Sequence, residues 1–281
     1  MFKRRTTGSV VCPACGSLVG VNDERCYTCG RRNPGLWGFG PVLRQLGADM
    51  GFVPLVMTGS VVMFLISLLL SRGNVSQLLG PSGEALFVLG ASGAYPVFIR
   101  SHWWTLLSAT WLHVNAVHIV FNMMAFRSFG PASAEMIGPA RTVIVYTISG
   151  VCGFLLSSVL ARYVYLPIPF FQGSSFVVGA SASICGLLGA LLHYGQRTGS
   201  RLITSQVRTY AVMILISGVI IPYVDNSAHL GGFLGGYATS WFFDPLVRER
   251  GDHALVAVVC LAATLLAVIA SVVAGLPPRG A

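Results

Sequence analysis

Four polar side chains stand out because each lies in an apolar segment that carries few other polar groups. Ser181 lies within Gly179–Ala190, GASASICGLLGA, and His229 lies in a second segment that is also rich in glycine. His118 and Asn122 lie four residues apart in a third segment, HIVFN, and so share one helical face. A serine, an imidazole base and side-chain hydrogen-bond donors are the groups that acyl transfer requires. These residue types therefore predict serine-based chemistry, provided that the segments meet.

Small residues at four-residue spacing predict how two of these segments meet. Along a helix they form a bare face, which lets two helix backbones approach closely inside a membrane. The two faces consist of Ala182, Gly186 and Ala190 in one segment and of Ala228, Gly232 and Gly236 in the other. Contact between these faces would set Ser181 beside His229.

The composition is that of a membrane protein. The 281 residues are 54% hydrophobic and only 10% charged, and the mean hydropathy is +0.73. Such a chain is too apolar for a soluble domain, so we expect a polytopic membrane protein. The formal net charge of +9 comes from basic residues scattered over short loops and the amino terminus. This distribution favours a role in membrane orientation, and we expect no nucleic-acid partner.

Seven apolar segments follow a polar amino-terminal region, and each is near the ~20 residues that a membrane-spanning helix requires. They cover residues of about 53 to 71, 114 to 130, 139 to 161, 179 to 195, 203 to 222, 227 to 243 and 254 to 275. The predicted fold is all-α: a bundle of six transmembrane helices, a seventh carboxy-terminal helix, and a small zinc ribbon before them. The predicted parts are the ribbon unit at 1–36, a linker at 37–52, the six-helix core at 53–243, and a cytosolic loop, seventh helix and short tail at 244–281.

Basic residues decide the predicted orientation. With the amino terminus inside, 14 of the 18 Lys and Arg residues fall inside, and four fall outside: Arg72, Arg100, Arg162 and Arg279. This excess follows the positive-inside rule. We expect a multi-pass protein of a prokaryotic inner or plasma membrane, with its amino terminus cytosolic and its carboxy terminus outside. His118, Ser181 and His229 then reach a similar depth near the outer side, at the positive ends of three helix dipoles.

Two CxxC pairs, Cys12 with Cys15 and Cys26 with Cys29, are separated by ten residues near the amino terminus. Four thiolates at this spacing predict a closed, tetrahedral structural Zn²⁺ site without catalytic function. Two disulfides or a redox CxxC are the alternatives, but disulfides need an oxidising compartment and the basic flank places this segment in the cytosol. A protein partner that docks on the ribbon is compatible with such a unit.

Three motifs together resemble the rhomboid family of intramembrane serine proteases over most of residues 95–243. They are Trp111-Leu-His113 followed by His118 and Asn122, then Gly179-Ala-Ser181, and finally Ala228-His229-Leu-Gly-Gly. The resemblance implies a Ser–His dyad with Ser181 as nucleophile and His229 as general base. It implies an oxyanion hole formed by His118, Asn122 and the backbone amide of Ser181. The expected reaction is cleavage of single-span membrane proteins near the outer side of the bilayer, without a catalytic cofactor.

The resemblance also implies structural roles for two residues, and the chain departs from the family pattern at two positions. Glu135, expected in the loop after the second helix, would support the first outer loop, and His113 would have a structural or hydrogen-bonding role in that loop. Where the family commonly has glycine after the nucleophile, this chain has Ala182, whose methyl group could narrow the site. The family's tryptophan–arginine pair reads Trp104-Thr105 here, which affects loop geometry rather than chemistry.

Several alternatives stay open. Ser183 is a second hydroxyl, about 200° around the helix from Ser181, so only one of the two can face His229. Asp225 could orient the imidazole as a third member, although a helix cap is the commoner role. The histidines without an assignment are His102, His193 and His253. For the whole protein, the alternatives are an inactive rhomboid-like protein that binds membrane clients, and a small-molecule transporter, for which charged midplane sites would be expected.

Overall fold

The computed structural model describes residues 6–12, 15–38, 48–71, 79–221, 224–247 and 249–275. The chain divides into two compact units, Met1–Gly51 and Phe52–Ala281. Most of the predicted linker lies outside the described residues, as do the start of the predicted first outer loop, with Arg72, and the predicted tail.

The amino-terminal unit is a small antiparallel hairpin. Strand β1 (Ser9–Val11) pairs with β2 (Leu18–Gly20), with Val10 opposite Val19. Alternate residues of a strand point to one face, so these two valines share the buried side. They pack with Val21, Cys12 and Cys26, and the short helix η1 (Leu36–Gly38) follows. So small an apolar core is typical of domains that need a disulfide or a structural metal ion for stability.

Seven long helices form most of the second unit, and each covers one of the predicted apolar segments. They are α2 (Phe52–Leu70), α5 (Ala116–Ile137), α6 (Pro139–Tyr163), α7 (Ser181–Arg197), α8 (Arg201–Ile220), α9 (Asn226–Trp241) and α10 (Gly251–Gly275). Within the described ranges, α2, α6, α8 and α10 are long and apolar enough to cross a membrane. Helices α7 and α9 are shorter, with 17 and 16 residues. The predicted all-α membrane fold is confirmed.

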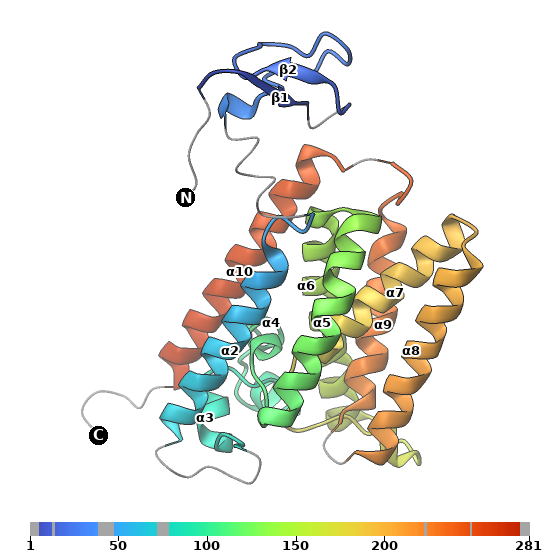
Figure 1. Cartoon of the computed structure of the whole chain (residues 1–281). Helices are drawn as coiled ribbons and strands as arrows, with labels where there is room; N and C mark the ends of the chain where they lie inside the picture. The colour runs from blue at the N-terminus through green and yellow to red at the C-terminus, as the bar shows by residue number, and fades with distance from the viewer. Residues whose placement is uncertain are drawn as a thin grey trace. The chain divides into compact units, whose positions relative to one another are not determined.

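Helix α7 is the centre of the helical unit. It packs against α5, α6, α8 and α9, and every residue from Ala182 to Leu191 is buried. Helix α8 lies at one side and buries only Val207 and Gly218, whereas α2 and α10 lie at the other side (Figure 1). The predicted chemistry therefore starts on the most enclosed helix of the unit.

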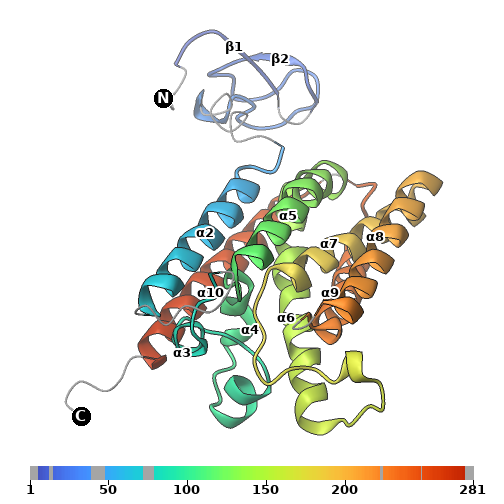
Figure 2. The ribbon, with the colours of Figure 1, turned by 60° about the horizontal axis from the view of Figure 1, so that its bottom comes forward.

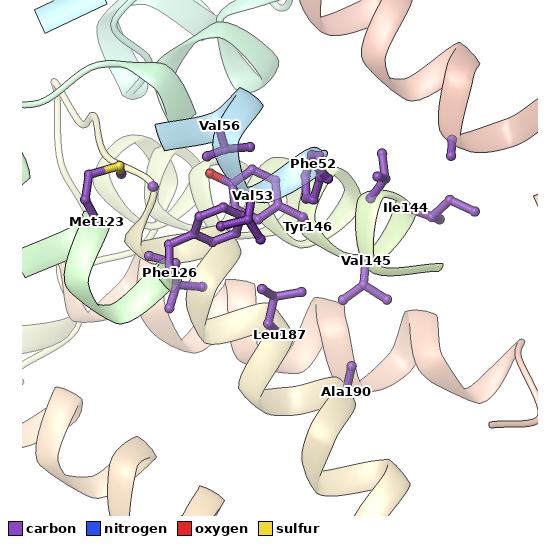
Figure 3. Packing of buried hydrophobic residues seen from close by; sticks show 14 of the residues in the cluster. Phe52, Val53, Val56, Met123, Phe126, Ile144, Val145, Tyr146, Leu187 and Ala190 are labelled. Atoms are coloured by element: carbon purple, nitrogen blue, oxygen red, sulfur yellow. The ribbon is translucent and has the colours of Figure 1, made fainter. Parts of the chain in front are cut away.

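A ring cluster joins α2, α5 and α6. The ring centroid of Phe52 lies 5.9 Å from that of Phe126 and 5.4 Å from that of Tyr146, and Phe126 and Tyr146 are 5.2 Å apart (Figure 3). Val145 and Leu187 belong to the same buried cluster and extend it to α7. Tight packing of this kind holds the helices at fixed spacing, because core voids and strain are both costly.

The loop before α5 is folded into short helices rather than being open. It contains α3 (Gly83–Val88), the π-helix η2 (Tyr95–Ile99), α4 (Thr105–Ser108) and η3 (Ala109–Trp111). Its backbone pairs with the segment before α7: the amide of Ser92 donates to the carbonyl of Val177 over 3.1 Å, and Val177 donates back over 2.8 Å. That segment, which includes η4 (Pro169–Phe171), runs along this loop region to reach α7 (Figure 2). The loop before α5, predicted as the first outer loop, thus supports the approach to Ser181.

Candidate active site

Ser181 is the first residue of α7, at a turn that only glycine fits. Gly179 has a φ of +132°, and a Cβ built on it would lie 2.7 Å from His118 Cε1 and 3.7 Å from Ser181 Oγ. The first helical bond runs from the amide of Ile184 to the carbonyl of Ala180 over 2.9 Å. The Ser181 amide has no carbonyl within the helix to bind, so it is available to an outside acceptor. The Ser181 side chain is half-buried.

Helices α7 and α9 meet through their small residues, as predicted. A Cβ on Gly232 would collide with the carbonyl of Ala182, and one on Gly236 would collide with the carbonyl of Gly186. Helix α6 joins the same contact, because a Cβ on Gly153 would lie 2.8 Å from the Ala182 methyl group and 3.2 Å from the Gly232 amide. Side chains on any of these glycines would push the backbones apart.

This contact brings Ser181 and His229 to the same end of the α7–α9 pair. Each lies one residue away from a member of the contact, Ala182 and Ala228 respectively. His229 is half-buried, and its Nδ1 atom is buried without a hydrogen-bond partner in the described part of the chain. No hydrogen bond joins Ser181 to His229 among the described residues. Catalytic hydrogen bonds are often long before substrate binds, so this separation is compatible with a dyad.

His118 adopts a defined tautomer beside the serine. Its Nδ1 accepts a hydrogen bond from the Val114 amide over 3.4 Å, which leaves the proton of a neutral ring on Nε2. That Nε2 atom lies 3.0 Å from the position that a Gly179 Cβ would occupy, next to Ser181. The ring also lies close enough to His229 for electrostatic interaction. His118 therefore presents an N–H donor at the head of α7.

Asn122 is buried one turn below His118 on α5. Its Nδ2 atom donates to the His118 carbonyl over 2.9 Å. An amide nitrogen carries two protons, so one donor is left for another acceptor. The start of this helix is fixed by Asn115, whose side chain accepts from the His118 amide over 2.8 Å.

Three neighbouring residues face the helix interfaces. Ser183 is fully buried, its hydroxyl has no partner among the described residues, and it lies against Gly150 of α6. The Ala182 methyl group is buried against Gly153, so the added carbon lies in helix packing and does not narrow the approach to Ser181. His113 is fully buried with its ring centroid 5.2 Å from that of His118, a position from which it holds that ring edge-on.

The placement of Glu135 corrects the sequence analysis. It lies in the last turn of α5 rather than in a loop, and its side chain is exposed. At about 1.5 Å per residue it is ~28 Å from the start of α5, which is the end that the preceding loop joins. The prediction ended this helix before Pro131, whereas α5 continues through Pro131 to Ile137. Glu135 therefore cannot support that loop.

Thr105 stands where the resemblance would place an arginine, and it forms a local hydrogen bond instead. Its hydroxyl donates to the His102 carbonyl over 2.7 Å, and its side chain is buried. The neighbouring Trp104 ring stacks on His102 at a centroid distance of 4.7 Å. Burial, and secondly the charge of Arg100, lower the pKa of His102, so that this histidine is neutral in the stack.

Sequence reasoning identified the cap at Asp225 but missed the network around it. The Asp225 carboxylate accepts from the Ala228 amide over 3.0 Å, which caps α9. Its second oxygen accepts from the Ser157 hydroxyl of α6, which in turn accepts from the Ser174 amide over 3.1 Å. A cavity of about 310 Å³ opens beside Ser174, Asp225 and Gly218. The network joins the helix that carries His229 to the segment that precedes Ser181.

A second polar cluster, at the other end of the helices, was also missed. Arg141 is buried at the start of α6 and donates through NH1 to the carbonyls of Asp244 and Val247 over 3.1 and 2.8 Å. Its Nε donates to His253 Nδ1 over 3.3 Å, and its backbone amide donates to Glu249 over 2.6 Å. These bonds tie the connection between α9 and α10 to the start of α6. His193, in contrast, packs on the rings of Tyr237 and Trp241.

The four amino-terminal cysteines form one cluster. Their Sγ atoms lie within 4.8 Å of one another, with 3.8 Å between Cys12 and Cys29 and 3.6 Å between Cys15 and Cys26. A disulfide would need about 2.05 Å, whereas ligands about 2.3 Å from a tetrahedral metal are ~3.8 Å apart. The sulfur geometry therefore fits one metal ion better than two disulfides.

The packed helices and the candidate site together define an integral, multi-pass membrane protein. Residues 100–246, just over half of the chain, match the family model of the Rhomboid domain. The chain belongs to the rhomboid family.

Curated relatives agree with this assignment. The chain is 32% identical to RHOMBOID-like protein 1 of Arabidopsis thaliana over 180 residues, which are 62% of this chain and 43% of that protein. It is 31% identical to Rhomboid protease GluP of Bacillus subtilis over 183 residues, 64% of this chain and 34% of GluP. It is 26% identical to Rhomboid-like protease 3 of Toxoplasma gondii over 69% of this chain and 70% of that protein. The chain thus spans less than half the length of the first two relatives.

Proposed function

We propose that this protein is an intramembrane serine endopeptidase that uses Ser181 and His229 to cleave single-span membrane proteins. The observation that carries the proposal is the α7–α9 contact, in which glycines let the two backbones touch beside both residues. Membership of the rhomboid family and the names of two relatives as proteases support it.

In the proposed reaction, Ser181 Oγ attacks the scissile carbonyl while its proton passes to His229 Nε2. The C–N bond then breaks and His229 returns the proton to the leaving amine. Water attacks the acyl-enzyme with His229 again as base, which releases the carboxylic acid and regenerates the serine. Because Nδ1 of His229 is buried, Nε2 is the nitrogen that a serine or a water molecule can reach.

The developing oxyanion would receive bonds from three donors. These are the Nε2–H of His118, the second amide proton of Asn122 and the backbone amide of Ser181 at the positive end of α7. A single donor of this kind contributes roughly 10²–10³ in rate in other serine proteases. The cavity beside Asp225, one turn before His229, offers a route for the hydrolytic water.

For the membrane setting, we propose that the amino terminus is cytosolic and that cleavage occurs near the outer side of the bilayer. The excess of basic residues on the inner side supports this orientation. The relatives come from a bacterium, a plant and a parasite, and the prokaryotic origin stays a prediction. A helical substrate must unwind locally to expose its backbone, so small or helix-breaking residues are expected near the cut.

The test is cleavage of a single-span membrane protein by the purified protein in liposomes. Wild type is compared with Ser181→Ala, after size-exclusion chromatography has shown that both proteins are folded. We expect a defined cut by wild type alone. Absence of cleavage by wild type, or equal cleavage by both proteins, would reject the protease assignment.

Asp225 tests whether the site is a dyad. If Asp225 only caps α9, Asp225→Asn keeps an oxygen that accepts from the Ala228 amide, so the cleavage rate should fall by no more than a few-fold. Asp225→Ala removes the cap and should lower the stability of the helix by about 1 kcal/mol. As a third catalytic member, Asp225→Asn would cost about 10⁴ in kcat, as in a Ser–His–Asp triad. Initial rates and melting temperatures of the two variants distinguish these roles.

For the cysteine cluster, we propose one structural Zn²⁺ held by the four thiolates. Wild type should contain one zinc per chain, and Cys26→Ser should lose it and the protection of the hairpin amides, because binding and folding are coupled in so small a unit. Cys185→Ser, in buried α7, is the control that should keep the metal. Elemental analysis of the full chain decides; retention of zinc by Cys26→Ser would contradict the assignment.

A further inference from the structure

We propose that α10 positions the nucleophile, with Ser271 and Ser108 as positioning residues that hold the first outer loop against the segment before Ser181. This inference rests on the proposed protease function. Helix α10 lies beyond residues 100–246, the part that matches the Rhomboid domain. It nevertheless packs on α3, α4 and α6.

The link between α10 and the loop is a buried pair of hydroxyls. Ser271 Oγ lies 3.1 Å from Ser108 Oγ, and Ser108 Oγ donates to the Gly90 carbonyl over 2.9 Å. Both serines are buried. Ser271 Oγ also lies 2.9 Å from the Ala267 carbonyl of its own helix, so its single proton is shared between that carbonyl and Ser108. When Ser271 donates to Ser108, a continuous chain of hydrogen bonds runs from α10 to Gly90.

The loop backbone lies close against α10 around these two serines. Gly90 has a φ of +101°, and a Cβ there would collide with both serine hydroxyls. Nearer the end of α10, a Cβ on Gly275 would lie 2.6 Å from Val88 Cα. The loop backbone therefore rests directly on α10 at two points, and a bulkier side chain at Ser271 must displace it.

From Ser108 the contact continues to the nucleophile. The next residue, Ala109, accepts a hydrogen bond through its carbonyl from the Gly179 amide over 3.0 Å. Gly179 lies two residues before Ser181 and against the His118 ring. A shift of Ser108 would therefore move the turn that sets Ser181 beside its oxyanion donors.

The other end of α10 is fixed as well. Arg141 holds the preceding connection through Asp244, Val247 and His253. A helix held at both ends cannot slide to relieve a clash at Ser271. A change at Ser271 should for that reason be transmitted to the loop.

The experiment uses Ser271→Ala and Ser271→Leu in the full chain. Thr264→Val is the matched control, because Thr264 is also buried on α10 and also donates to its own helix, to the Cys260 carbonyl over 2.8 Å. Unlike Ser271, it has no hydrogen bond to the loop residues that the structure describes. Two quantities are measured: kcat and KM for a single-span substrate, and hydrogen–deuterium exchange of the peptide that covers residues 174–181.

We expect Ser271→Leu to lower kcat about 10- to 100-fold, since misplacement of a reacting group by about 1 Å has effects of this size. Ser271→Ala should lower kcat about threefold, with KM within about twofold of wild type, and Thr264→Val should match wild type. Exchange in 174–181 should become faster in both Ser271 variants and not in the control. If Ser271→Leu fails to fold, Ser271→Ala decides.

Two outcomes would overturn the proposal. Unchanged exchange in 174–181 would show that α10 does not hold this segment, whatever the activity. Faster exchange in 174–181 with unchanged kcat would show that α10 contacts this segment but does not position Ser181 for catalysis. A wild-type protein that cleaves nothing would reject the protease function separately, because the exchange comparison needs no activity.

Discussion

Replacing Ser181 or His229 by alanine is expected to abolish cleavage, with a loss in kcat of at least about 10⁴-fold for either variant. The double variant should be no slower than the single ones, because the serine and its base act as one unit and cannot be removed twice. Initial rates on a single-span substrate give the comparison, at protein concentrations high enough to detect the residual activity.

The matched control for this prediction is Ser183→Ala. Ser183 lies two residues along α7, but its hydroxyl is buried against α6 rather than at the α7–α9 site. Its removal should leave the rate within about twofold, as expected for a group that takes no part in the transition state. Loss of activity in Ser183→Ala together with retention in Ser181→Ala would identify Ser183 as the nucleophile and would contradict the proposal.

The second large effect is expected at Gly236. A Cβ at this position collides with the carbonyl of Gly186, a backbone atom that no side-chain rotation can move. Gly236→Val should destabilise the helical unit by about 3 kcal/mol, at the upper end of overpacking costs. For a unit of this size the melting temperature in detergent should fall by about 6–12 °C.

Gly251→Ala provides the control for Gly236. Gly251 begins α10, has no strained φ, and has no atom within 4 Å of an added Cβ. Its replacement should change stability by less than about 0.5 kcal/mol. Equal melting temperatures for Gly236→Val and wild type would mean that α7 and α9 can separate without cost, and the basis of the proposed dyad would be lost.

The elements that could be predicted are those with a local sequence signal. Apolar segments of sufficient length marked the seven helices, and small residues four apart marked the faces by which α7 and α9 meet. The spacing of two CxxC pairs similarly predicted the sulfur cluster. In each case the physical cause repeats over a few residues, so the sequence carries it directly.

The polar contacts that were missed have no such repeat. Ser108 and Ser271 are 163 residues apart, and nothing near either serine indicates its partner. Glu135 was placed in a loop because the apolar segment was taken to end at about residue 130, whereas α5 continues through Pro131 to Ile137. The Ala182 methyl group was assigned to the approach to Ser181, although the residue after a helix start can also point into the bundle. These features depend on how helices pack, which the chain alone did not specify.

Arg141 has a consequence for the order of events during synthesis. Its partners Asp244, Val247 and Glu249 follow it by 103 to 108 residues, so they do not yet exist when α6 leaves the ribosome. At roughly 5–20 residues per second, the backbone amide and guanidinium of Arg141 wait about 5–20 seconds for these partners. The bundle can therefore close at this end only after the connection between α9 and α10 has been made, and this late segment locks the start of α6 in place.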